Sequence, residues 1–306
     1  MALLGEGMSY GSPFAVEARG LTKRYDGTTA VEALDLAIPR GSVYGFLGPN
    51  GAGKTTTIRM LVTLLRPTDG TARVAGAPVT ERDRVTPNIG YLPETPPVHD
   101  ELTGREQLEY VAGLRELSAA DDRIDELLER FDLAGAADRR IDTYSRGMKR
   151  KTGLIQAILH EPAVIFFDEP TAGLDPRVAR TVRETIADLA AGETTVFLST
   201  HVLPVVDELA DTVGVLPDGR LVAEGSPERL KRRAEGGERS LERAFLDVTG
   251  GDDLPRDTPG NAPDRADDAG TAPGGAGPGA DPDGDGSEAS TADGGTEPTD
   301  ADADAA

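Results

Sequence analysis

The sequence contains no cysteine, little lysine and no long hydrophobic run. Without cysteine the chain forms no disulfide, uses no catalytic thiol and builds no cysteine metal site. Its 3 histidines, at positions 99, 160 and 201, are too far apart in the sequence to suggest a metal cluster. No apolar run approaches the ~18 residues that a membrane span needs. The first residues also lack the basic segment and apolar core of a signal peptide. These absences predict a soluble, cytosolic protein.

The scarcity of lysine accompanies an excess of acidic side chains. Only five of the 32 basic residues are lysines, and the formal net charge is −22. Residues 251–306 carry 15 acidic and 2 basic side chains and almost no large apolar residue, so we predict a disordered acidic tail there. The charge balance argues against nucleic acid as a partner. An acidic surplus with little lysine is typical of proteins kept soluble at high salt, which suggests a salt-loving source.

A glycine-rich stretch at residues 48–55 fits G-x-x-x-x-G-K-[ST], the phosphate-binding P-loop. The apolar run at residues 42–47 predicts a buried strand before it, and residues 56–65 predict a helix after it. A chance glycine-rich turn is the alternative in a chain with 37 Gly among 306 residues. A random match with these flanks is expected only about one time in a hundred. The motif therefore predicts nucleotide binding.

Each part of this motif has a physical role in holding a phosphate. The glycines let the backbone turn tightly and aim successive N–H groups at one anion, beside the positive end of the helix dipole. Lys54 adds a cation at the outer phosphates, and the hydroxyl of Thr55 can bind Mg²⁺.

The rest of the chain alternates between strand and helix patterns. Residues 14–21 and 33–38 alternate in polarity, which predicts an antiparallel sheet ahead of the P-loop strand. A capping box at residues 103–106 opens a helical subdomain predicted over about 95–157. Strand patterns return at 163–167 and 194–199, with a helix that begins at Asp175 and Pro176 between them. Residues 226–250 predict short C-terminal helices, and residues 1–12 predict a flexible N-terminus.

Several further positions can carry chemistry, although each has a plainer interpretation. Asp168 and Glu169 follow the 163–167 strand at the end where α/β folds present ligand groups. Asp168 suits Mg²⁺, and Glu169 can polarise a water for attack on the γ-phosphate, but adjacent carboxylates can also form a solvated turn. Tyr25 either stacks on a base or fills a surface. Ser145 is either part of an anion site or an ordinary helix cap, and an isolated His201 is more often structural.

In their order and spacing these elements resemble the nucleotide-binding subunit of an ABC transporter over residues 14–225. The resemblance implies that Glu169 is the catalytic carboxylate, that His201 is the switch histidine and that Asp175 contacts a second subunit. The ATP-binding residues that it implies are Tyr25, Gly48, Pro49, Asn50, Gly51, Ala52, Gly53, Lys54, Thr55 and Thr56. The signature motif, which contacts the ATP of the partner subunit, matches Ser145, Arg146, Gly147 and Met148. The implied Mg²⁺ ligands are Thr55, Glu94 and Asp168.

The sequence departs from the family pattern at three positions. Glu94 stands where the family usually has a glutamine; a carboxylate still offers a hard oxygen ligand, but its charge can alter metal affinity or rate. Arg146 and Met148 replace the glycine and glutamine of the usual signature L-S-G-G-Q, while Ser145 and Gly147 are retained. This signature and residues 240–246 resemble the ABC-2 branch, whose ATPases pair with separate membrane subunits, many of them exporters.

The resemblance implies an α/β fold with a P-loop NTPase (RecA-like) core, an N-terminal antiparallel β subdomain and an inserted helical subdomain, in an ATPase domain at residues 13–225. It implies an ATPase that uses ATP and Mg²⁺ and closes as a head-to-tail dimer with a second copy or a paralogous subunit. A multi-span membrane permease would form the pathway, which puts the chain at the cytoplasmic face of the membrane.

Other functions remain open on the sequence. A soluble ABC-type ATPase of translation or DNA repair usually has two cassettes or a long coiled coil, whereas only about 90 residues separate the P-loop from the signature here. A non-hydrolysing regulator is disfavoured by Glu169 and His201. A GTPase is disfavoured because the sequence contains no Asn-Lys-x-Asp motif.

Overall fold

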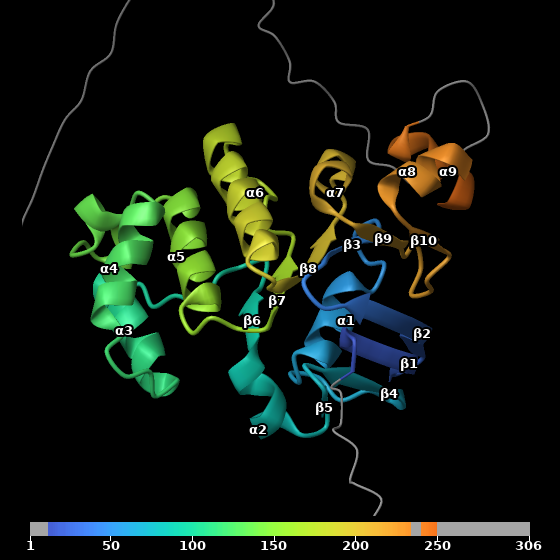
Figure 1. Ribbon diagram of the computed structural model, residues 1–306, viewed down its shortest axis with the longest axis horizontal. Coiled ribbons are helices and arrows are strands. Elements are labelled where there is room, and N and C mark those ends of the chain that lie inside the picture. Colours follow the sequence, from blue (N-terminus) through green and yellow to red (C-terminus); the bar gives the residue numbers. More distant parts are fainter. Residues whose placement is uncertain (1–11, 234–239, 250–306) are drawn as a thin grey trace, which may run out of the picture. The chain divides into compact units, whose positions relative to one another are not determined.

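The computed structural model describes residues 12–233 and 240–249, and two sheets organise them (Figure 1). The larger sheet has the strand order β10-β9-β3-β8-β7-β6. Its strands β6 to β9 pair in parallel with their neighbours, and β10 pairs antiparallel with β9. Their bounds are β3 (Val43–Leu47), β6 (Ile89–Leu92), β7 (Val164–Asp168), β8 (Thr195–Thr200), β9 (Thr212–Val215) and β10 (Ala223–Gly225). This is the α/β core predicted from the sequence.

The central strands of this sheet are buried along their whole length. Every residue of β3, β7 and β8 is buried, as expected for parallel strands that are covered on both faces. Successive side chains of a strand point to opposite faces. Accordingly, Ile165 and Phe167 join one apolar cluster, whereas Val164 and Phe166 join the other. The large sheet therefore separates two cores.

The smaller sheet is antiparallel, with the order β2-β1-β4-β5. Its strands are β1 (Phe14–Tyr25), β2 (Thr28–Pro39), β4 (Asp69–Val74) and β5 (Ala77–Pro78). The second half of β2 alternates between exposed and buried residues, because one face covers the core and the other meets solvent. The predicted antiparallel β subdomain is therefore present. Its apolar face shares a core with β3 and with helix α1 (Lys54–Leu61).

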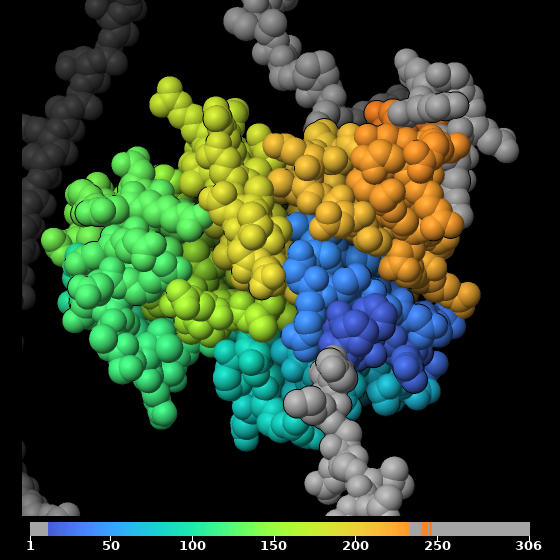
Figure 2. Space-filling model, viewed as in Figure 1, coloured from blue at the N-terminus to red at the C-terminus, as the bar shows by residue number. Residues whose placement is uncertain are grey.

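Most of the longer helices follow the P-loop region in the chain. Figure 1 shows α3, α4 and α5 gathered on the side of the large sheet that lies away from β1 and β2. On the face drawn in Figure 2, the surface of α6 lies between this helical group and the N-terminal strands. The helices after α1 are α2 (Arg82–Val85), α3 (Gly104–Leu114), α4 (Asp121–Arg130), α5 (Arg146–Ile158), α6 (Pro176–Ala191), α7 (Leu203–Leu209), α8 (Pro227–Arg233) and α9 (Leu241–Thr249). Short 3₁₀ turns lie at Thr86–Asn88, Ala134–Ala136 and Ile141–Thr143.

The P-loop helix differs from its predicted span of 56–65. It begins at Lys54, inside the motif, and ends at Leu61. Thr63 has a φ of 66°, in the left-handed region that ends a helix. The N–H groups of Leu64 and Leu65 then turn back to the carbonyl of Arg59. The apolar residues 61–65 gave no signal for this stop, because the strained residue is a threonine and not a glycine.

The C-terminal helices pack on the described core, as their spacing predicts. Leu241 and Phe245 are buried, and α9 contacts α7 and α8. The side chain of Val248, residues 1–11 of the predicted N-terminal segment and the predicted acidic tail at 251–306 lie outside the described residues. Among the described helices, none has the length and apolarity required to cross a membrane.

Candidate active site

The P-loop and the predicted catalytic residues meet because three parallel strands end at one edge of the large sheet. Leu47 at the end of β3 pairs with Thr200 at the end of β8. Asp168 at the end of β7 pairs with Ser199. The loops that leave these strands therefore lie side by side, at the edge where α/β sheets bind ligands.

Two glycines of the P-loop are required by close backbone contacts. A Cβ on Gly48 would lie 2.1 Å from the carbonyl oxygen of Leu216. Gly53 has a φ of 95°, and a Cβ there would lie 2.3 Å from the carbonyl oxygen of Ala30. The loop thus winds tightly against its neighbours before α1 begins. The first turn of α1 has no acidic residue, so its electropositive end faces the loop without a competing charge.

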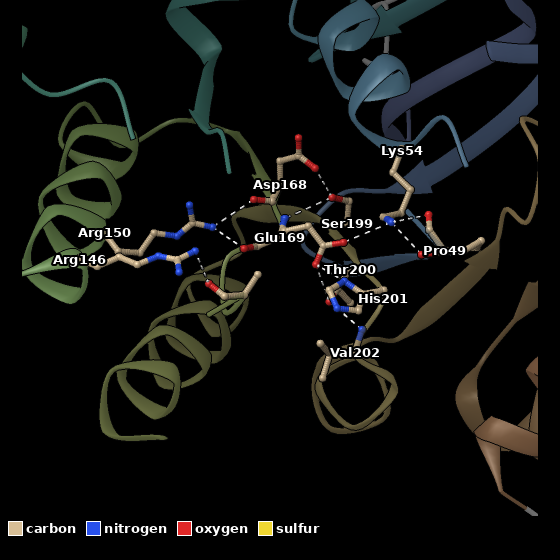
Figure 3. A network of polar contacts seen from close by, with 12 residues as sticks. Pro49, Lys54, Arg146, Arg150, Asp168, Glu169, Ser199, Thr200, His201 and Val202 are labelled. Atoms are coloured by element: carbon tan, nitrogen blue, oxygen red, sulfur yellow. Dashed lines mark hydrogen bonds and ion pairs between the residues drawn. The ribbon is translucent and has the colours of Figure 1, made fainter. Parts of the chain in front are cut away.

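Lys54 is buried and its ammonium group already has three oxygen neighbours. Nζ donates to the carbonyls of Gly48 at 2.7 Å and Pro49 at 3.0 Å. It also lies 3.2 Å from Oε1 of Glu169, with which it forms an ion pair (Figure 3). A phosphate that enters the loop has to compete with these groups for the ammonium.

The carboxylate of Asp168 is held by the neighbouring strand. Asp168 is 1% exposed, and its Oδ1 accepts a hydrogen bond from the hydroxyl of Ser199 at 2.6 Å. Charge-assisted bonds of this kind are stronger than neutral ones. Ser199 was not predicted as a site residue; its only sequence signal is its place directly before Thr200 and His201.

Glu169 has an unusual backbone that directs its side chain into the site. Its φ is 48°, and its N–H donates to the carbonyl of Ser199 at 3.1 Å. Oε2 accepts from the hydroxyl of Thr200 at 3.3 Å and from Nδ1 of His201 at 3.0 Å. The buried Oε1 has no hydrogen bond within the described residues, only the ion pair with Lys54. A carboxylate oxygen with no hydrogen-bond donor of its own is suited to accept a proton or orient a water.

A cleft of about 380 Å³ lies over these groups. It is lined by Ala30, Asn50, Gly51, Ala52, Gly53, Lys54, Thr55, Thr56, Glu94, Glu169, Ala172 and His201. The structure therefore brings together the predicted P-loop, Glu94, Glu169 and His201. Tyr25 does not line this cleft; its ring is 47% exposed and has the ammonium of Lys23 at 5.2 Å.

The predicted signature residues form the start of α5 and do not line the cleft as the described residues define it. Ser145 is the N-cap, and its hydroxyl accepts from the N–H of Met148 at 3.2 Å. A Cβ on Gly147 would lie 2.9 Å from a methyl of Val178, so this glycine allows α5 to approach α6. Arg146 donates to the carbonyl of Ala172 at 3.4 Å.

Asp175 caps α6, which confirms the predicted cap of that helix. Its Oδ1 accepts from the N–H groups of Arg177 at 3.0 Å and Val178 at 3.1 Å. The side chain is exposed, so its capping role does not prevent a contact with another molecule.

The side chains fit Mg²⁺ only with help from a ligand. Thr55, Glu94 and Asp168 offer hydroxyl and carboxylate oxygens, which Mg²⁺ prefers. Within the described residues, however, no group of three or more His, Cys, Asp or Glu side chains is placed to hold a metal ion. Mg²⁺ usually takes one or two protein oxygens and completes its shell with phosphates and water. Thr55, Glu94 and Asp168 therefore suit a Mg²⁺ ion that also binds the phosphates of a nucleotide.

Arg150 is a second neighbour of the site, besides Ser199, that sequence reasoning missed. It is 4% exposed and lies between the cleft-lining loops, where burial lowers the pKa of its guanidinium to about 10. Within residues 144–151 it is one of four basic residues, and the sequence gives no reason to single it out.

Known proteins resemble this chain in sequence and in structure. Residues 31–172 match the family model described as ABC transporter. A daunorubicin/doxorubicin resistance ATP-binding protein of Streptomyces peucetius is 47% identical over 220 residues, which cover 71% of this chain and 67% of the relative. A solved ATP-binding subunit of an ABC transporter superposes with a TM-score of 0.71 at 30% identity, covering 77% of this chain and 99% of that one. The chain is a member of the family of ABC transporter ATP-binding subunits.

A relative named for bacitracin transport also matches this chain. The bacitracin transport ATP-binding protein of Enterococcus faecalis is 38% identical over 222 residues, which cover 72% of each chain. The ABC ATP-binding subunit described here is thus an ATPase. The resemblance inferred from the motifs is confirmed.

Proposed function

We propose that this subunit hydrolyses ATP at the P-loop cleft to drive export of a substrate through a separate membrane permease. The single observation that carries the proposal is the convergence on Glu169: its carboxylate pairs with the P-loop Lys54 on one side and with His201 on the other. Export is supported by the relatives, one named for drug resistance and one for bacitracin transport. The Tyr-Ser-x-Gly-Met signature agrees with the ABC-2 branch.

In this proposal each group at the cleft has one task, and so does Tyr25 outside its lining. The P-loop amides and Lys54 bind the phosphates. Glu169 orients and deprotonates the attacking water, and His201 holds the carboxylate through Nδ1. Tyr25 stacks on the adenine. Thr55, Asp168 and Glu94 would hold Mg²⁺ together with the phosphates, and the ion would supply positive charge at the transferring phosphoryl group.

We propose further that two subunits complete the site. Ser145, Arg146, Gly147 and Met148 do not line the cleft formed by the described residues of their own chain, so a task at the phosphates requires a second chain. A head-to-tail dimer, with a second copy or a paralogous subunit, places this helix start on the partner's ATP, with Asp175 at the contact. The helices near residues 95–115 then meet the permease at the cytoplasmic face of the membrane.

The decisive experiment replaces Glu169 by glutamine, which keeps the size and hydrogen-bonding capacity of the side chain but not its basicity. We expect ATP affinity to stay within a small factor of wild type and turnover to fall by roughly 10²–10⁴-fold, the range for a lost general base. ATP binding is measured with a fluorescent analogue and turnover by phosphate release. The matched control is Glu193→Gln, an exposed carboxylate before β8. Hydrolysis at the wild-type rate in Glu169→Gln would sink the proposal.

A further inference from the structure

Arg150 lies in the second turn of α5 and uses every N–H of its guanidinium. Nε donates to the carbonyl of Pro170 at 3.0 Å. One terminal nitrogen donates to Pro93 at 2.8 Å and Glu94 at 2.6 Å. The other donates to Asp168 at 3.1 Å and Glu169 at 2.5 Å. An arginine has five N–H donors, and here each one has a backbone carbonyl.

These carbonyls belong to two loops that are far apart in the sequence. Residues 93 and 94 follow β6, and residues 168 to 170 follow β7. Both loops contribute to the P-loop cleft, the first through Glu94 and the second through Glu169. Figure 3 shows the Arg150 side chain extending from α5 toward the backbone of Asp168 and Glu169. Arg150 therefore ties the helix that begins at the signature motif to both cleft-lining loops.

Burying the charged guanidinium of Arg150 carries a desolvation cost that its hydrogen bonds have to offset. Arg150 is 4% exposed, and within the described residues no carboxylate forms an ion pair with it. Its direct partners are carbonyl groups, while the charges of Asp168, Glu94 and Glu169 act on it from beyond ion-pair distance. A buried charge held without a direct ion pair is rare. A buried apolar residue would fill the space between the loops but would leave these five carbonyls without their donor.

Glu169 is the residue that gains most from this contact. Its φ of 48° lies in a region that residues with a Cβ seldom adopt. Such a backbone conformation persists only where surrounding contacts stabilise it. The N–H of Glu169 is held by Ser199 and its carbonyl by Arg150. With both peptide groups fixed, the side chain points at Lys54 and His201.

We propose that Arg150 is a positioning residue for ATP hydrolysis. It holds the backbone of Glu169 so that the carboxylate faces the nucleotide, and it fixes the backbone of Glu94 relative to that of Glu169. The inference rests on the proposed role of Glu169. Arg150 touches none of the P-loop residues that bind the phosphates, so its effect falls on turnover and not on ATP affinity.

The test compares Arg150→Lys with Lys151→Ala in the full-length chain. Lysine keeps the charge but has three donors on one nitrogen, so it cannot bridge two loops with a planar fork. We expect Arg150→Lys to lower kcat by about tenfold or more, as a misplaced catalytic group does, with KM for ATP and the affinity for a fluorescent ATP analogue within about twofold of wild type. Lys151, the next residue on the same helix, takes part in none of the contacts made by Arg150, and its variant should match wild type.

The same measurements in a Glu169→Gln background separate the possible failures. If Arg150 acts through Glu169, adding Arg150→Lys to that background lowers kcat little further, because both changes remove the same function. A wild-type kcat in Arg150→Lys overturns the proposal, as does a full additive loss in the double variant. So does an equal loss of ATP binding and turnover, which marks a merely structural role. Undiminished hydrolysis in Glu169→Gln alone instead defeats the proposed function of Glu169.

Discussion

At the scale of single residues, Glu94 is one of the positions where the sequence departs from the pattern expected of the family. Its side chain is exposed and lines the P-loop cleft, while its carbonyl is bound by Arg150. The charge of Glu94 is therefore free to act on the contents of the cleft, whereas the position of its backbone is fixed. Exposure limits the strength of that action, because solvent screens an exposed carboxylate.

Replacing Glu94 by glutamine restores the residue usual in the family and tests this charge. We expect the half-saturating Mg²⁺ concentration for ATP hydrolysis to rise by about 2–5-fold, the scale of one exposed charge interaction. The measurement is a Mg²⁺ titration of ATPase activity at fixed ATP, with Glu193→Gln as the control. An unchanged or lower Mg²⁺ requirement would remove Glu94 from the set of metal ligands.

Residue types and spacing were enough to predict the candidate site residues that directly follow the strands. The P-loop, Asp168, Glu169 and His201 could each be assigned from the sequence because a short motif or a buried strand leads directly into them. Arg150 and Ser199 could not be assigned in this way. The bonds of Arg150 reach carbonyls up to 57 positions away in the sequence, and backbone carbonyls leave no trace in the residue types.

At the scale of elements, helix α3 shows how a local signal fixes the start of a helix. The capping box predicted at Thr103 is present: its hydroxyl accepts from the N–H of Glu106 at 3.2 Å, and the Glu106 carboxylate accepts from the N–H of Thr103 at 2.8 Å. These bonds lower the pKa of Glu106, and they satisfy two N–H groups that the helix itself cannot pair.

Thr103→Ala removes half of this box. We expect the midpoint of thermal unfolding to fall by about 2–4 °C, as the loss of an N-cap in a domain of this size implies. Differential scanning fluorimetry measures the shift. Glu106→Gln is the control, because glutamine also completes a capping box and should leave the midpoint close to that of wild type. Equal midpoints for Thr103→Ala and wild type would contradict the stabilising role.

The junction between the end of α5 and β6 contains a buried histidine, His160. His160 follows α5, and its Nε2 hydrogen-bonds the carbonyl of Ile89 at 2.9 Å, while its buried Nδ1 has no partner within the described residues. Burial, and then the charge of Arg115, lowers the pKa of His160 from 6.5 to about 4. The folded chain thus favours the neutral ring.

A prediction for stability follows from this pKa. Between pH 6.5 and about 4 the unfolded chain binds the proton of His160 more readily than the folded chain, so stability falls as the pH falls through this window. Above pH 6.5 His160 is neutral in both the folded and the unfolded chain, so protonation of this residue no longer lowers the free energy of unfolding. We expect His160→Gln to flatten this part of the curve of unfolding midpoint against pH. Parallel curves for the variant and wild type would show that His160 does not titrate in this way.

At the scale of elements the sequence predicted strands better than helix ends. Alternation identified β1 and β2, and continuous apolar runs identified β3, β7 and β8. Burial of one face of a strand produces alternation in the sequence, and burial of both faces produces a continuous apolar run. The end of α1 was missed, because it depends on a left-handed Thr63. The short α2 and β5 were also missed, since they depend on their neighbours and have too few residues to show a period.

At the scale of the whole molecule, the formal net charge of −22 favours a chain adapted to salt. Self-repulsion destabilises the folded state until salt screens it. We expect the unfolding midpoint to rise as KCl increases from 0.1 to 1 M, where the screening length falls from about 10 Å to about 3 Å. A midpoint and an ATPase activity that survive dialysis into low salt unchanged would contradict the hypothesis of a salt-loving source.

The strand order of the large sheet has a consequence for synthesis. β8 lies between β3 and β7 and pairs with both, although it follows both in the chain. A nascent chain therefore lacks the centre of its sheet until residue 200 has left the ribosome. The antiparallel sheet, complete by Pro78, needs no later strand and can form early. Domains fold as units, and exposed strand edges invite misassembly. A ribosome that stalls between β7 and β8 therefore leaves both edges of β3 and one edge of β7 without their partner strands.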